Sequence, residues 1–181
     1  MDRTPGIRPR PTLWRRLDAA ARHCFPATAT VVGMILSAAP FGLPGQAQIL
    51  PAWVLACVFF WSLFRPAAMS PPVVFLIGVL ADLLGQMPLG VSVVVLLAAH
   101  GLALRVRRVL PRQGFLVVWL VFVAVAAGAS ALEWVLLSAL SLRLLPPIAV
   151  VFQFGLTAGL YPILAAVFIR AHRGLAAPEQ A

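Results

Sequence analysis

Two carboxylates and one histidine lie inside long apolar stretches of this 181-residue sequence: Asp82, Glu133 and His100. A charged side chain at the centre of a membrane helix costs about 2.5–3.5 kcal/mol on insertion scales, so it usually has a bonding partner or a function. One interpretation makes Asp82 and Glu133 a buried polar site for a ligand, a proton or a partner helix. The other has Asp82 bonded to backbone or water near the turn at Pro88. In that case Glu133 extends outward, which is the interpretation we favour for Glu133.

Patterns typical of catalysis or of metal binding are missing from the sequence. It contains no HExxH motif, no phosphate-binding loop, and only two cysteines, Cys24 and Cys57, in no CxxC arrangement. A lone histidine such as His100 is more often a helix-packing or interfacial residue than a base. We therefore expect no enzyme, no metal and no cofactor.

The composition points to an all-α integral membrane protein. Hydrophobic residues make up 62% of the chain and charged residues only 10%, whereas soluble domains are about half apolar and a quarter charged. Such a chain cannot cover a soluble sphere with polar groups, and disordered chains are poor in apolar residues. Backbone polar groups must be paired internally in lipid, so the membrane spans are expected to be helices.

Six apolar runs predict a compact bundle of six transmembrane helices over residues 23–170. The second run has 16 residues and reaches only about 24 Å as a helix, short of a 30 Å hydrocarbon core. It therefore has to thin the bilayer, borrow flanking residues or pack where the membrane is shallow. The six predicted spans are 24–43, 49–64, 72–87, 89–104, 114–140 and 148–169.

The positive charges predict the orientation of this bundle. The net charge is +9, and every positive residue is an arginine, placed in short clusters between apolar runs. This placement suits topology signalling better than nucleic-acid binding. With a cytoplasmic N-terminus, thirteen of the fourteen arginines lie inside and only Arg143 outside. Residues 1–22 are then a basic cytoplasmic tail, held near anionic lipid, and residues 171–181 a short cytoplasmic tail. The alternative for Leu13-Trp14-Arg15-Arg16-Leu17 is a short amphipathic helix on the membrane surface, and the solvated tail is favoured over it.

Small, polar and aromatic residues predict how the helices pack. The GxxxG motif from Gly155 to Gly159 permits close helix approach, and packing within the chain is favoured over dimerisation. Three polar side chains are expected to bond between helices, and four tryptophans near span ends suggest interfacial anchors. These residues are Gln86, Gln153 and Thr157, and Trp53, Trp61, Trp119 and Trp134.

Two segments carry a resemblance to a known family. The first is Trp61-Ser-Leu-Phe-Arg65-Pro66, and the second is Phe75-Leu-Ile-Gly78-Val-Leu-Ala-Asp82-Leu-Leu-Gly85-Gln-Met-Pro88-Leu-Gly90. Here the chain resembles the bacterial rod shape-determining protein MreD family, in which an aromatic helix ending in Arg-Pro precedes a Gly-x-x-x-Asp-Leu-Leu-Gly segment closed by Pro-Leu-Gly. The resemblance extends over about residues 26–170.

The resemblance implies a multi-pass subunit of the cell-elongation machinery in the bacterial cytoplasmic membrane, which organises lateral peptidoglycan synthesis. Its implied partners are MreC, MreB, RodA and the elongation transpeptidase, besides membrane lipids. The family is similar in helix layout to the substrate-binding components of energy-coupling-factor transporters. Our hypothesis has small-residue faces docking the single membrane helix of MreC, while Arg105, Arg107 and Arg108 contact cytoplasmic partners or serve only as topology signals. A vitamin-type transporter component and a lipid-carrier binding protein remain alternatives.

Overall fold

The computed structural model describes the backbone of residues 13–39, 46–144 and 146–176, and the side chains of 23–39, 48–144 and 146–170. The described chain is all-helical. Its elements are α1 (Leu13–Ala38), α2 (Gln46–Phe64), α3 (Pro71–Gly85), α4 (Val91–Val106), the 3-10 helix η1 (Leu110–Arg112), α5 (Phe115–Ser141) and α6 (Pro147–Ala176). The predicted tail over residues 1–12 lies outside the described residues. Residues 13–22 are the first turns of α1, which begins well before the predicted span.

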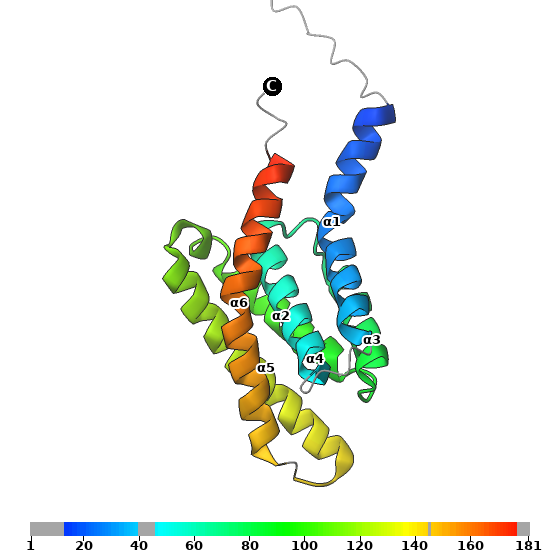
Figure 1. The fold of residues 1–181 in the computed structure, drawn as a ribbon, viewed down its shortest axis with the longest axis vertical. Helices are drawn as coiled ribbons and strands as arrows, with labels where there is room; N and C mark the ends of the chain where they lie inside the picture. Colours follow the sequence, from blue (N-terminus) through cyan, green and yellow to red (C-terminus); the bar gives the residue numbers. More distant parts are fainter. Residues whose placement is uncertain (1–12, 40–45, 145, 177–181) are drawn as a thin grey trace, which may run out of the picture.

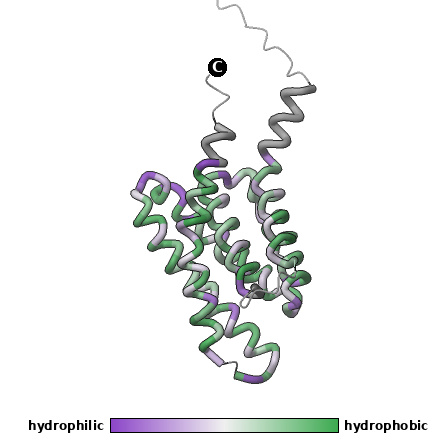
Figure 2. The backbone as a smooth tube through the Cα atoms, in the orientation of Figure 1, coloured by the Kyte–Doolittle hydropathy of each residue, from purple (hydrophilic) through white to green (hydrophobic). Residues whose placement is uncertain are grey.

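Successive helices alternate in direction along one bundle (Figure 1). The start of α1, the α2–α3 and α4–α5 connections and the end of α6 lie at one end of the molecule. The α3–α4 and α5–α6 turns lie toward the other end, where α5 and α6 extend beyond the remaining helices as a hairpin. The backbone is apolar along the helices and polar mainly near their ends (Figure 2).

The short helix α2 is the centre of this bundle. It contacts α1, α3, α4 and α6, and nearly every residue from Ala52 to Leu63 is buried. Its 19 residues reach about 28 Å. Because other helices surround most of its length, little of its apolar surface is left to be covered from outside the bundle.

Aromatic rings connect α2 to its neighbours. Phe122 of α5 stacks on Tyr161 of α6 with ring centroids 3.9 Å apart, and Phe59 of α2 meets both rings edge-on. Trp61 is completely buried against Phe60 and Phe168. The prediction that Trp61 is an interfacial anchor is therefore wrong, because its ring fills the core.

Two of the described helices, Phe115–Ser141 and Pro147–Arg170, are long and apolar enough to cross a membrane. Four shorter helical segments are also apolar: His23–Ala38, Gln48–Phe64, Pro71–Gly85 and Val91–Val106. Large apolar side chains face outward on several of these helices, among them Leu36, Leu76, Leu102, Leu120 and Ile163. Apolar outer surfaces of this extent are typical of interaction with lipid or with other proteins.

Candidate functional site

Asp82 is fully buried near the end of α3, and each oxygen of its carboxylate accepts a backbone N–H group. The N–H of Gly90 donates to Oδ2 at 2.7 Å, and the N–H of Ser92 donates to Oδ1 at 2.9 Å. Its backbone carbonyl also accepts from the N–H groups of Gln86 and Met87. The sequence leaves two interpretations of Asp82 open, and the structure supports the one in which Asp82 bonds to backbone at the turn.

These bonds explain why a turn of this sequence needs an acid eight residues before its glycine. The carboxylate of Asp82 caps the first turn of α4, where free N–H groups and the helix dipole favour negative charge. Gly90 has a φ of +102°, a conformation that costs glycine little and other residues more. The turn that Pro88 and Gly90 form is thus closed by a side chain from the preceding helix.

Gly78 brings α3 and α4 into close contact above this turn. A Cβ atom at Gly78 would lie 2.7 Å from the Cα of Val93, closer than real side-chain atoms approach. Gly85, by contrast, is exposed, and a Cβ there would meet only Met87 Cγ at 3.6 Å. Of the two glycines that the resemblance marks in α3, only Gly78 is required for packing.

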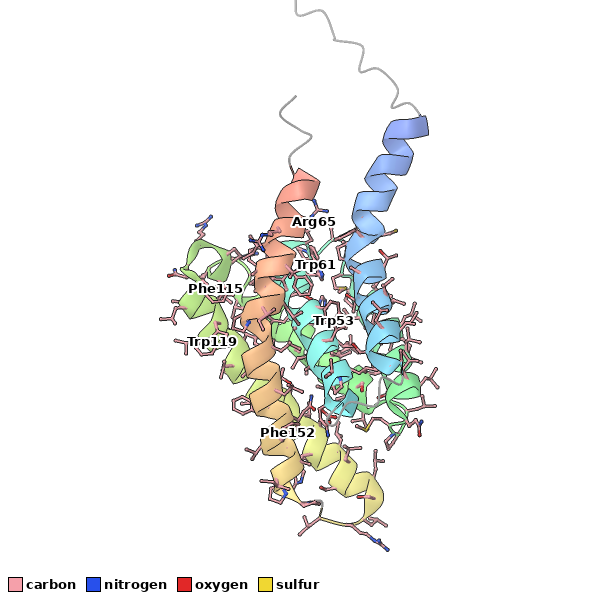
Figure 3. All side chains as sticks on the ribbon, viewed as in Figure 1. Trp53, Trp61, Arg65, Phe115, Trp119 and Phe152 are labelled. Carbon is pink, nitrogen blue, oxygen red and sulfur yellow. The ribbon has the colours of Figure 1, made fainter. Side chains whose placement is uncertain are left out.

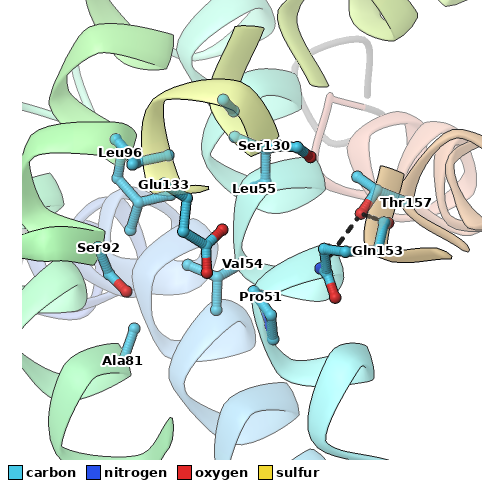
Figure 4. Close-up of a pocket in the computed structure, with 12 residues that line it drawn as sticks. Pro51, Val54, Leu55, Ala81, Ser92, Leu96, Ser130, Glu133, Gln153 and Thr157 are labelled. Atoms are coloured by element: carbon cyan, nitrogen blue, oxygen red, sulfur yellow. Dashed lines mark hydrogen bonds between the residues drawn. The ribbon is translucent and has the colours of Figure 1, made fainter. Parts of the chain in front are cut away.

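Glu133 of α5 has quite different surroundings. Its side chain is half-buried, and no hydrogen bond to its carboxylate is found among the residues that the structure describes. The carboxylate points inward, toward Ser92 of α4 and Pro51 of α2 (Figure 4). The neighbouring helices thus leave space for this carboxylate inside the bundle, and its extension toward the outer membrane face stays a prediction.

Two adjoining cavities share Glu133 as a wall. The smaller has a volume of about 30 Å³, room for roughly one or two waters. The larger has a volume of about 280 Å³ and lies between the α5–α6 hairpin, the start of α2 and Met87 of the α3–α4 turn. Its walls are mostly apolar, and its polar lining consists of Glu133, Gln48, Gln153 and Ser130.

Hydrogen bonds fix the amide of Gln153 at the border of both cavities. Its Nε2 donates to the backbone carbonyl of Gln48 at 3.3 Å and to Thr157 Oγ1 at 3.4 Å, and Thr157 in turn donates to the backbone carbonyl of Gln153. The predicted inter-helix role of Gln153 is thereby confirmed, through α2. Gln86 does not bond between helices: it is exposed and ends α3 in a left-handed conformation.

His100 is a buried packing residue that joins α4 to α2. Its Nδ1 lies 2.7 Å from Ser62 Oγ, while Nε2 is buried without a hydrogen-bond partner in the described part of the chain. This confirms the helix-packing interpretation. The two acids and the histidine of the apolar helices therefore do not form one site: Asp82 caps a helix, His100 bonds to α2, and of the three only Glu133 faces a cavity.

The arginines divide between the two ends of the bundle. The α2–α3 connection begins at Arg65, labelled in Figure 3, and the α4–α5 connection contains Arg107, Arg108 and Arg112. Arg105 and Arg170 lie in the last turns of helices that end on this side. Arg143 is exposed in the α5–α6 connection at the opposite end. Arg105, Arg107 and Arg108 are all exposed.

Two tryptophans join helices in ways that the sequence analysis missed. Trp119 donates from Nε1 to the backbone carbonyl of Ala158 at 3.1 Å. That carbonyl has no helical donor, because Pro162, four residues on, lacks an N–H. Trp53 donates to the carbonyl of Thr30 and covers Gly33, where a Cβ would clash with its ring. Trp53 therefore connects α2 to α1, and Trp119 connects α5 to α6. Their rings are half-buried, so neither serves only as an interfacial anchor.

Gly155 and Gly159 do not pack inside the chain. Both are exposed, and a Cβ added at either would meet nothing within 4 Å among the described residues. The expectation of packing within the chain is therefore wrong. The two glycines lie in an outward row of α6, the α6 stripe, which consists of Val151, Gly155, Gly159, Ile163 and Val167.

Comparison with family models, curated proteins and solved structures yields no match for this chain.

Proposed function

We propose that the chain is a multi-pass protein of the bacterial cytoplasmic membrane, with all six helices crossing the bilayer and both termini in the cytoplasm. The alternating helix directions support this, since every arginine of the described side chains except Arg143 then belongs to the cytoplasmic end. The outward apolar side chains of α1, α3 and α4 support it too. α3 and α4 are shorter than the hydrocarbon core and would be accommodated by local thinning.

Within that membrane, the chain acts as a non-catalytic scaffold subunit of the cell-elongation complex, in line with its resemblance to the MreD family. The observation that carries this proposal is the α6 stripe. It places two glycines between β-branched residues on an outward face, and a Cβ at either glycine would meet nothing within 4 Å among the described residues. Close backbone approach at such a stripe is a common basis of helix association in lipid. The partner proposed for it is the single membrane helix of MreC.

Co-purification from detergent tests this docking face. In the variant Gly155→Leu/Gly159→Leu, recovery of MreC should fall about tenfold or more, equivalent to about 1.4 kcal/mol of binding free energy. The control is Gly128→Leu on α5, since Gly128 is also exposed and a Cβ there would meet nothing within 4 Å among the described residues. Undiminished MreC recovery with the α6 double variant, or an equal loss with the α5 control, would contradict the proposal.

The proposed contact between arginines of the α4–α5 side and cytoplasmic partners needs a separate test. Replacing Arg105, Arg107 and Arg108 by glutamine should reduce recovery of MreB without reducing that of MreC. Cysteine labelling of the 106–111 segment must still report a cytoplasmic location in that variant, because the same arginines also signal topology. Labelling of this segment from the periplasm in the unmodified chain would overturn the six-span arrangement itself.

The cellular role has its own readout. Depletion of the chain should convert rod-shaped cells to rounded ones. The Gly128→Leu variant should restore rods, whereas the α6 double variant should not. Retention of rod shape after depletion would exclude the scaffold role.

A further inference from the structure

The larger cavity beside Glu133 presents hydrogen-bond acceptors in an apolar space. The carboxylate of Glu133 has no hydrogen-bond partner among the described residues. Gln48 Oε1 is buried beside the cavity without a partner. Gln153 uses its Nε2 for bonds to the backbone carbonyl of Gln48 and to Thr157, which leaves its Oε1 as a further acceptor.

This region holds two acidic side chains, Asp82 and Glu133. Glu133 lies close enough to Asp82 for the two carboxyl groups to interact electrostatically. Among the residues that the structure describes, no arginine, lysine or histidine lines either cavity. An unpaired carboxylate in an apolar medium is costly, so a cation that enters the cavity gains both a charge partner and a set of acceptors.

The size and lining of the cavity limit what the cation can be. A volume of about 280 Å³ is near the lower end of small-ligand sites and corresponds to roughly nine waters of liquid. Apolar walls, among them Trp134, Leu137 and Val150, suit an apolar body. The acceptors suit a group that carries both a positive charge and N–H donors.

We propose that this cavity binds a primary ammonium group attached to an apolar body, with the ammonium paired to Glu133. Two sources supply this chemistry: a free organic amine, or the headgroup of an ethanolamine phospholipid. The cavity lies toward the end of the bundle that carries the α3–α4 turn and the α5–α6 hairpin. The inference rests on the proposed membrane placement and is independent of the scaffold role.

Binding of radiolabelled phenethylamine to the full chain in phosphatidylcholine nanodiscs tests the first source. Phosphatidylcholine carries no N–H, so it leaves the acceptors unpaired. We expect saturable binding that phenylethanol does not displace, about tenfold or more weaker in Glu133→Gln and partly retained in Glu133→Asp. Ala149→Leu, which fills the cavity while keeping the carboxylate, should also abolish binding, whereas Gly128→Leu should not.

Native mass spectrometry of the chain released from mixed ethanolamine and choline phospholipid discs tests the second source. Selective retention of the ethanolamine lipid, lost in Glu133→Gln and Ala149→Leu, would identify a headgroup as the occupant, and competition with phenethylamine would place both in one site. Absence of both binding activities, or undiminished binding in Glu133→Gln, would overturn the inference. MreC recovery measured on the same variants separates this outcome from a failure of the proposed scaffold function.

Discussion

The two carboxylates that lie in apolar helices, Asp82 and Glu133, occupy two hairpins built in opposite ways. In the α3–α4 hairpin the helices touch at Gly78, and both oxygens of Asp82 accept backbone N–H groups. In the α5–α6 hairpin the helices extend beyond the bundle, and Glu133 faces a cavity with no hydrogen bond from the described residues. One acid closes a turn, and the other is open to a partner.

This contrast shows that an acid within an apolar helix is not by itself a sign of a binding site. Asp82 belongs to the segment that carries the resemblance, yet its bonding capacity is used within the chain. The residue with unused bonding capacity is Glu133, which lies outside that segment. Hydrogen-bond satisfaction, rather than charge or depth, distinguishes the two roles.

Replacing each acid should give opposite results, and this is the largest effect we expect. Asp82→Ala leaves two backbone donors at the start of α4 without a charged acceptor, at about 1.5–3 kcal/mol for each bond. The free energy of unfolding should fall by about 3–6 kcal/mol. Glu133→Gln removes no hydrogen bond within the described chain, so its unfolding free energy should be unchanged or slightly higher. Unfolding by sodium dodecyl sulfate in detergent micelles measures both.

Asp82→Asn is the control for this pair. It keeps one oxygen acceptor, so it should lose less stability than Asp82→Ala. If Asp82→Ala unfolds like the unmodified chain while Glu133→Gln is strongly destabilised, the assignment of the two roles is reversed.

Two glycines in α3 allow a further test of how closely the α3–α4 hairpin is packed, with a smaller expected effect on stability. Gly78→Ala forces a methyl group against the backbone of Val93, and overpacking of this kind costs about 1–3 kcal/mol. Gly85→Ala meets only ordinary contact and gains helix propensity of up to about 1 kcal/mol. The same unfolding assay should therefore separate them. Equal stability of the two variants would show that α3 and α4 are not held as closely as the structure has them.

Much of the helical framework could be predicted from the sequence. Long apolar runs separated by arginines, Pro88 and Gly90 gave element positions close to those of the structure, because such interruptions leave few alternatives. Burial could not be predicted in the same way: the run containing Trp61 is as apolar as its neighbours, and only tertiary packing makes it the central helix. The start of α1 at Leu13 was not predicted, because the arginines of residues 13–22 interrupt the apolar pattern from which the spans were derived.

The site was harder to predict because it depends on pairing between distant residues. Pro88, Leu89 and Gly90 predict a turn, but only the coordinates reveal that both oxygens of Asp82 accept hydrogen bonds there. Glu133, Gln48 and Gln153 come from three helices, and one sequence gives no measure of their proximity. The prediction that Gly155 and Gly159 pack within the chain failed because a GxxxG motif does not reveal whether its helix face points into or out of the bundle.

The smallest predicted effect concerns a carbonyl that α6 cannot satisfy itself. Trp119 donates to the carbonyl of Ala158 in place of the N–H that Pro162 lacks. Trp119→Phe should lower the free energy of unfolding by about 1–2 kcal/mol, since the part-buried carbonyl of Ala158 loses its side-chain donor. In a Pro162→Ala background, the restored backbone N–H supplies that partner, and the same substitution should cost clearly less. A double-mutant cycle measures this coupling, expected at about 0.5 kcal/mol or more. If the unfolding free energies of the two substitutions are additive, the indole of Trp119 contributes only by packing. Hydrogen-bond satisfaction would then explain less of the stability of this bundle than the contrast between Asp82 and Glu133 suggests.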